Sequence, residues 1–117
     1  MLCDVLVTGV NSDEGIAEVK GPTILNDEER CFIRESCKFV TEVAPKTAYA
    51  CTESLLDSLD CRYYVHGDDP AFGTDGTDMC DNMAKIGRFK QFKRTPGVST
   101  TDITAKLLDL VSGYYSN

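Results

Sequence analysis

A nearly continuous apolar run, Val5–Val10, does most to limit the folds open to this chain. A strand pattern in which apolar and polar residues do not alternate is typical of a parallel sheet that helices cover on both faces. Further strand patterns then alternate with helix patterns along the chain. We expect strands at Val5–Val10, Thr41–Ala44, Arg62–Val65 and Phe89–Lys93, and helices at 26–40, 52–59, 78–86 and after Ser99. This order predicts the α/β class, with an open, mostly parallel sheet flanked by helices.

Local start and stop signals sharpen these boundaries. Asn26 followed by Glu29 has the pattern of a capping box, so we expect a helix to begin there. Phe32 and Phe39 are expected on the inward face of that helix. Pro45 is expected to end the strand that follows, because proline lacks the N–H that a ladder needs.

The composition of the 117 residues narrows the class of protein. A formal net charge of −7 argues against a nucleic-acid surface, which needs a basic face. No apolar run approaches the roughly 20 residues of a membrane span, and the first residues lack the pattern of a signal peptide. The length suits one domain with a single core.

The spacing of the cysteines and of the histidine indicates whether the chain binds a metal and in which cellular compartment it resides. The six cysteines form no Cys-x-x-Cys pair, and the chain has one histidine, His66. A zinc site is therefore not expected. We expect six reduced, mostly buried thiols and a cytoplasmic location.

The segment Arg94–Ile103 has the composition of a phosphate site at the start of a helix. An arginine, a glycine and several hydroxyls precede an apolar-periodic run that begins at Ile103. A helix start leaves about four backbone N–H groups unpaired and carries roughly half a positive charge, which suits an anion. The alternative is an ordinary capped helix after a Pro–Gly turn. The residues with a predicted phosphate role are Arg94, Thr95, Gly97, Ser99 and Thr100.

Four loops that follow the candidate strands carry polar or flexible residues: Gly9–Asn11, Pro45–Tyr49, His66–Asp69 and Arg94–Ser99. In open parallel sheets, ligands sit beyond the carboxyl ends of the strands. The cations available for a local positive site are Lys20, Arg88, Lys90, Lys93 and Arg94. The sequence therefore predicts a ligand site where these loops meet.

Several strings, taken in their order along the chain, resemble the cytidylyltransferases of phospholipid synthesis, and among these the ethanolamine-phosphate branch. The specific strings are Val65-His66-Gly67-Asp68-Asp69 and Arg94-Thr95-Pro96-Gly97-Val98-Ser99-Thr100-Thr101-Asp102, and a weaker one is Lys20-Gly21-Pro22. The resemblance covers roughly residues 3–108. It implies a Rossmann-like nucleotidyltransferase fold.

The resemblance also implies a reaction in which CTP and phosphoethanolamine give CDP-ethanolamine and pyrophosphate. By this match Lys20 and Arg94 are the catalytic residues. Lys20 binds phosphate groups of both substrates, and Arg94 holds the phosphates of CTP, which Mg²⁺ accompanies. The residues that cradle these phosphates are Thr95, Gly97, Ser99 and Thr100.

The same match places His66, Asp68 and Asp69 near the nucleotide and the substrate amine, because carboxylates attract an ammonium group. Tyr49 stands beside the substrate cation and adds a cation–π contact. No metal ligands are implied within the chain. The implied partners are CTP and phosphoethanolamine, together with a second copy in a homodimer or a second cytidylyltransferase lobe.

The chain departs from the family pattern at a histidine motif. The superfamily carries His-x-Gly-His after its first strand, whereas His66 belongs to a different string. We therefore expect residues 1–117 to form a single, partial catalytic domain that lacks the family's first strand and first helix and has negligible activity alone. The open alternatives are a choline-phosphate or glycerol-phosphate cytidylyltransferase, and a non-catalytic nucleotide-binding lobe.

Overall fold

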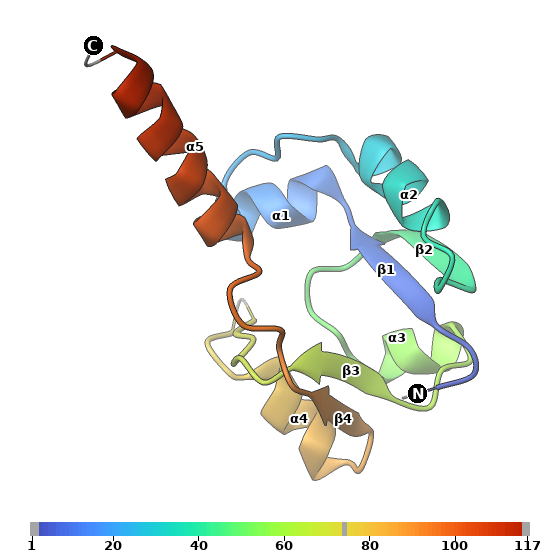
Figure 1. Ribbon diagram of the computed structural model, residues 1–117. Helices are drawn as coiled ribbons and strands as arrows, with labels where there is room; N and C mark the ends of the chain where they lie inside the picture. The colour runs from blue at the N-terminus through green and yellow to red at the C-terminus, as the bar shows by residue number, and fades with distance from the viewer. Residues whose placement is uncertain (1–2, 74, 116–117) are drawn as a thin grey trace.

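The computed structural model of the protein describes residues 3–73 and 75–115. Its elements in chain order are β1 (Val7–Asn11), α1 (Asp13–Lys20), α2 (Asp27–Glu35), β2 (Glu42–Thr47), α3 (Glu53–Ser58), β3 (Tyr64–Gly67), α4 (Met79–Lys85), β4 (Phe89–Phe92) and α5 (Thr100–Tyr115). Strands and helices largely alternate, as the sequence predicts, and α5 projects away from the rest of the molecule (Figure 1).

The strands form two parallel pairs. β1 pairs with β2, and β3 pairs with β4, each pair making a two-stranded sheet. The α/β class and the parallel pairing are thus confirmed, while the expected open sheet is divided between the two pairs. In the first pair Gly9 lies opposite Ala44, and in the second His66 lies opposite Gln91.

Polar side chains cap the helices, and those of α2, α3 and α4 lie where the sequence indicates that helices begin. The capping box of α2 is complete: Asn26 Oδ1 accepts from the Glu29 N–H at 2.8 Å, and Glu29 Oε1 accepts from the Asn26 N–H at 3.1 Å. The side chains that cap α1, α3 and α4 belong to Ser12, Thr52 and Asp78. Each cap satisfies a backbone N–H that the helix itself leaves unpaired.

The prediction that Phe32 and Phe39 face inward from α2 is wrong. Phe32 is 70% exposed and Phe39 is 71% exposed. The helix ends at Glu35, because Ser36 caps it, and its N–H donates to the Phe32 carbonyl at 3.1 Å. Phe39 therefore lies in the turn beyond the helix, where the Lys38 ammonium sits 5.0 Å from the centre of its ring.

Pro45 does not end β2 as expected, because a bulge accommodates it. The register passes from Gly9 opposite Ala44 to Asn11 opposite Thr47, so β2 contains one more residue than β1 over this stretch. Lys46 has a φ of 51°, and an extra residue of this kind leaves part of the strand outside the ladder. A proline is tolerated at such a position since its missing N–H costs no ladder bond.

The described part of the chain has a small core and a large surface. The buried apolar side chains are those of Val10, Ala44, Leu56, Met79, Cys80 and Met83. The accessible surface is 8814 Å², compared with about 6300 Å² for a compact monomer of this size. The radius of gyration is 16.4 Å, compared with about 13 Å for a compact domain of this length.

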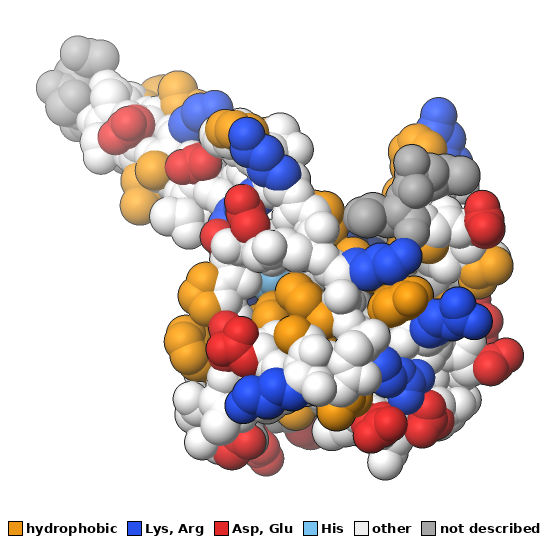
Figure 2. All heavy atoms as spheres, turned by 90° about the horizontal axis from the view of Figure 1, so that it is seen from below, with side chains coloured by type: hydrophobic (Ala, Val, Ile, Leu, Met, Phe, Trp, Pro, Cys, Tyr) orange, Lys and Arg blue, Asp and Glu red, His pale blue; other side chains and the backbone are white. Residues whose placement is uncertain are grey.

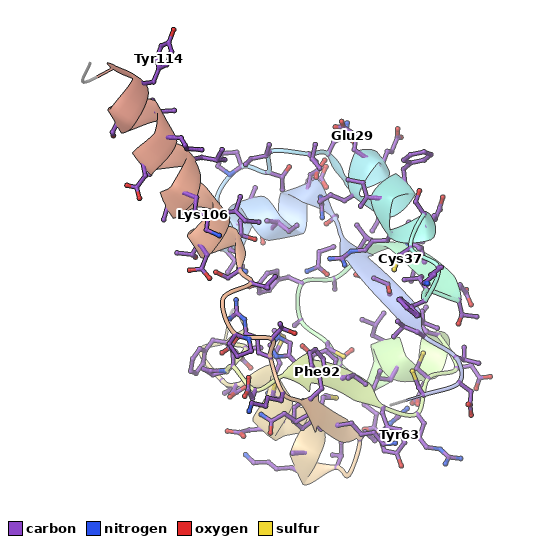
Figure 3. The ribbon with its side chains drawn as sticks, viewed as in Figure 1. Glu29, Cys37, Tyr63, Phe92, Lys106 and Tyr114 are labelled. Carbon is purple, nitrogen blue, oxygen red and sulfur yellow. The ribbon has the colours of Figure 1, made fainter. Side chains whose placement is uncertain are left out.

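The exposed apolar side chains include those of α5. Its apolar side chains recur at helical spacing at Ile103, Leu107, Leu110 and Val111, and each is more than half exposed. Figure 2 shows hydrophobic side chains along this projecting helix, and in Figure 3 Tyr114 points outward at its far end. None of the helices described is both long and apolar enough to span a bilayer.

All six cysteines carry unpaired thiols, but most are not buried as expected. Cys80 is buried, Cys37 is exposed, and the other four are half-buried. Cys37 is exposed because it follows the end of α2 in a surface turn, where Figure 3 labels it. Burial raises the pKa of the Cys51 thiol to about 11.

The two leucines Leu56 and Leu107 test where the core lies. Leu56 on α3 is 5% exposed, whereas Leu107 on α5 is 57% exposed. We expect Leu56→Ala to lower the free energy of unfolding by about 2–5 kcal/mol, because it empties a packed position. Leu107→Ala is expected to change it by less than about 0.5 kcal/mol. Urea unfolding followed by circular dichroism measures both, and equal losses would contradict the assignment of the core.

The thiols should differ in rate of modification. At pH 8 about one in a thousand Cys51 side chains is a thiolate, since its pKa is about 11. We expect an aromatic disulfide reagent to modify the exposed Cys37 first and Cys51 much later. Peptide mapping after timed quenching gives the order, and early labelling of Cys51 would show that the segment between β2 and α3 opens.

Candidate functional site

The predicted site residues from two segments meet at one end of the β3–β4 pair. The strands are parallel and in register, with Gly67 opposite Phe92. Their carboxyl ends therefore lie side by side, and Asp68 and Asp69 emerge next to Lys93 and Arg94. A Cβ added to Gly67 would lie 3.7 Å from the Phe92 ring, so the ring covers the backbone at this end of the pair (Figure 3).

Both aspartates contact Arg94, and they do so in different ways. Asp68 Oδ1 accepts from the Arg94 backbone N–H at 3.3 Å. Asp69 Oδ2 accepts from the Arg94 guanidinium in an ion pair. The Arg94 and Asp69 side chains are 48% and 50% exposed, so the pair remains open to solvent and to a ligand.

His66 lies inside β3 rather than in the turn that the sequence suggests. It is half-buried, and its Nδ1 donates to the Gly67 carbonyl at 3.0 Å. Its ring centroid is 6.0 Å from that of Tyr64. Burial raises the pKa of Tyr64 to about 12, so the neighbouring phenol is neutral.

The start of α5 is a serine-capped helix that follows a glycine turn. Ser99 Oγ accepts from the Asp102 N–H at 3.0 Å, and the Ser99 carbonyl accepts from the Ile103 N–H at 3.2 Å. Gly97 has a φ of 75°, which glycine adopts without strain, and it turns the chain into the helix. Thr95 and Thr100 are exposed on either side of this turn.

The second group of predicted site residues, Lys20 and Tyr49, is spread along α1 from its first turn to its last residue. Lys20 is the last residue of this helix and is exposed. Tyr49 is half-buried beside the first turn, where a Cβ on Gly15 would lie 3.9 Å from Tyr49 Cβ. Among residues 3–73 and 75–115, no hydrogen bond or ion pair joins Lys20 or Tyr49 to the Asp68–Arg94 group.

An ion pair fixes α1 against α2 and so places this second group. The Arg30 guanidinium donates to Asp13 Oδ1 at 2.6 Å, and the Thr23 hydroxyl donates to the same oxygen at 3.2 Å. The hydrogen bond from Arg30 is the chief reason that the pKa of Asp13 lies below its usual value. Neither Asp13 nor Arg30 was predicted to be catalytic, and both hold the helix that ends in Lys20.

The four cations that precede α5, Arg88, Lys90, Lys93 and Arg94, do not form one positive cluster. Arg88 turns away from the site: its guanidinium donates to Asp57 at 2.7 Å and to the Cys61 carbonyl at 2.6 Å. The Lys90 ammonium lies 4.3 Å from the centre of the Tyr63 ring. Only Lys93 and Arg94 of the cluster therefore follow β4 at the carboxyl end of the pair.

Sequence reasoning missed the hydrogen bonds that join the carboxyl ends of β1 and β2. The Thr47 hydroxyl donates to Asn11 Oδ1 at 3.0 Å, and the Ser12 N–H donates to the Thr47 carbonyl at 3.2 Å. Thr47 is the buried polar residue of this region. Its place after Pro45 offered no signal, because Pro45 was expected to end the strand.

In the Asp68–Arg94 group, the side chain suited to an anion is the half-exposed Arg94 guanidinium. An exposed guanidinium offers planar N–H donors that match carboxylate and phosphate oxygens. Within the described residues, no group of three or more histidine, cysteine, aspartate or glutamate side chains is placed to hold a metal ion.

Comparison with known proteins places the sequence in a family. The sequence matches the cytidylyltransferase-like family over residues 2–106. It is 43% identical over 116 residues to an ethanolamine-phosphate cytidylyltransferase of Dictyostelium discoideum, an overlap of 99% of this chain and 32% of that relative. It is 45% identical over 111 residues to the enzyme of that name from Arabidopsis thaliana, covering 92% of this chain and 26% of the relative.

A choline-phosphate cytidylyltransferase of Saccharomyces cerevisiae is 35% identical over 103 residues, which cover 88% of this chain and 24% of the relative. The chain thus spans about a third or less of the length of these curated relatives. The family match itself extends over nearly all of the sequence, including both groups of predicted site residues. The chain belongs to the cytidylyltransferase-like family.

Proposed function

We propose that this chain forms the phosphate-holding part of a cytidylyltransferase catalytic domain that uses CTP and phosphoethanolamine. The observation that carries the proposal is the meeting of Asp68 and Asp69 with Arg94 at the carboxyl ends of two parallel strands. The capped start of α5 follows Arg94 directly in the chain. Family membership and the names of the most similar relatives support the same reading.

In the proposed reaction a phosphate oxygen of phosphoethanolamine attacks the α-phosphorus of CTP. The bond from that phosphorus to the bridging oxygen breaks, and pyrophosphate leaves with the electron pair. A transfer of this kind depends on positioning and on neutralising charge, and requires no covalent intermediate with the protein. Mg²⁺ that enters with CTP supplies charge neutralisation on the triphosphate oxygens.

We assign the CTP phosphates to Arg94 and to the loop after it. The Arg94 guanidinium donates to phosphate oxygens, and the backbone N–H groups at the start of α5 add a positive field. Asp68 keeps the Arg94 backbone in place, and His66 presents Nε2 toward the nucleotide. The loop residues assigned to the phosphates are Thr95, Gly97, Ser99 and Thr100.

The second substrate is assigned to the group around α1. The Lys20 ammonium binds phosphate oxygens of both substrates, and the Tyr49 ring contacts the ethanolamine ammonium. Ethanolamine is favoured over choline because the ethanolamine-phosphate relatives are 43% and 45% identical, compared with 35% for the choline-phosphate relative.

A non-catalytic nucleotide-binding lobe is the second candidate. The sequence has one histidine, and its Nδ1 is bound to the Gly67 carbonyl. The paired histidines of the superfamily are thus absent from this sequence. Under either candidate we place the chain in the cytoplasm, where its unpaired thiols stay reduced, and in contact with a second copy or a second cytidylyltransferase lobe.

Loss of the Arg94 charge should weaken CTP binding. We expect Arg94→Gln to raise the dissociation constant of CTP about 10- to 100-fold, because a charge-assisted hydrogen bond is worth about 1.5–3 kcal/mol. CMP, which lacks the outer phosphates, should lose much less. Isothermal titration calorimetry measures both ligands. The matched control is Lys38→Gln, which removes a cation beside Phe39. Equal losses in the two variants would count against the assignment.

Catalysis by the 117-residue chain alone should be negligible. Each missing electrostatic donor typically costs about 10²–10³ in rate, and the two histidines of the motif are not in this sequence. A pyrophosphate-release assay with CTP and phosphoethanolamine checks this, with a complete ethanolamine-phosphate cytidylyltransferase as the positive control. Turnover comparable to that of the control would overturn the prediction.

A further inference from the structure

Arg94, the residue to which we assign the CTP phosphates, already has an anionic partner. Its guanidinium is bound by the Asp69 carboxylate, and both side chains are about half exposed. Asp68 contacts the same residue but uses the backbone N–H, at 3.3 Å. The two neighbouring aspartates therefore act on different parts of Arg94, one on its side chain and the other on its backbone.

A carboxylate and a phosphate compete for the same face of a guanidinium. Both present two oxygens that match its parallel N–H donors. We propose that Asp69 occupies the phosphate position on Arg94, so that a triphosphate binds by displacing the Asp69 carboxylate. Asp69 is then the residue that sets the affinity of the site for phosphate. This inference rests on the proposed function, because that proposal gives the phosphates to Arg94.

The contacts of Asp68 explain how the exchange leaves the loop in place. Its bond to the Arg94 N–H does not involve the guanidinium, so it persists when a phosphate replaces Asp69. The Gly67–Phe92 contact fixes the strand ends from which both loops emerge. The guanidinium can therefore change partners while the backbone around it keeps its position.

Two opposing effects decide the outcome of removing the Asp69 charge. Asp69 orders the Arg94 side chain, which favours binding, but an exposed ion pair confers only a weak constraint. Asp69 also occupies a donor of the Arg94 guanidinium and neutralises its charge. The second effect is larger, because the released charge of Arg94 attracts every phosphate of the ligand. Removing the carboxylate should thus tighten binding.

The test compares Asp69→Asn with Asp68→Asn by isothermal titration calorimetry on the 117-residue chain, with CTP as the ligand. Both variants remove one negative charge at the same loop, but an amide at position 68 still accepts the Arg94 N–H. We expect Asp69→Asn to bind CTP about three- to tenfold more tightly than the wild type at low salt. Asp68→Asn should gain less than about twofold, and the gain of Asp69→Asn should shrink as salt increases.

Two further variants make the test specific. Asp109→Asn, on the exposed α5, removes the same charge far from the strand ends and should leave affinity unchanged. In an Arg94→Gln background, Asp69→Asn should add little, since there is no guanidinium to release. Asp69→Asn affinity equal to or weaker than that of the wild type would overturn the inference, and so would a gain that persists without Arg94. Circular dichroism confirms that each variant is folded.

Sodium tripolyphosphate separates this inference from the proposed function. If tripolyphosphate binds with the expected dependence on Asp69 but CTP does not bind, the cytidylyltransferase proposal fails and the exchange at Arg94 stands. If CTP binds equally well to the wild type and to Asp69→Asn, the exchange is wrong and the proposed function stands. If neither ligand binds Asp69→Asn, both are overturned.

Discussion

Arg88 joins the two strands of the β3–β4 pair at their amino ends. Its carbonyl accepts from the Tyr64 N–H at 2.8 Å, and its guanidinium donates to the carbonyls of Cys61 and Arg62 at 2.6 and 3.0 Å. A further bond to Asp57, at 2.7 Å, raises the pKa of Arg88 above its ordinary value. One side chain thus connects the end of α3, the segment before β3 and the start of β4.

This connection matters because the two strands contribute opposite charges to the site. Register fixed at the amino ends is carried to the carboxyl ends, where Gly67 lies opposite Phe92. A slip of one residue would exchange the faces of β4 and move Arg94 away from Asp69. The position of Arg94 beside Asp69 therefore depends on Arg88, whose guanidinium is bound to Asp57 and to backbone carbonyls.

Features set by near neighbours in the sequence could be predicted. The capping box at Asn26 and Glu29 depends on residues three apart, and the start of α5 depends on Ser99 and the residues just after it. The pairing of segments far apart in the sequence was harder to predict. Pro45 read as the end of a strand, and only the pairing of β1 with β2 reveals the bulge that accommodates it.

The candidate site was predicted as a set of residues but not as a geometry. The strings around His66 and Arg94 pointed to phosphate chemistry, yet no pattern in either string shows that Asp69 binds Arg94. The basic cluster misled for a related reason. Arg88 and Lys90 are near Arg94 in the sequence, but the partners that take them, Asp57 and Tyr63, lie about 30 residues earlier.

The bulge in β2 has a consequence for how the protein meets other chains. A two-stranded sheet has two open edges, and each is a template for strand addition. On β2 that template is interrupted, because Pro45 offers no N–H and Lys46 brings a charge and a left-handed backbone. β1 has no such interruption between Val7 and Asn11. Growth of this sheet by a further strand is therefore directional: it can proceed from β1, on the side away from β2.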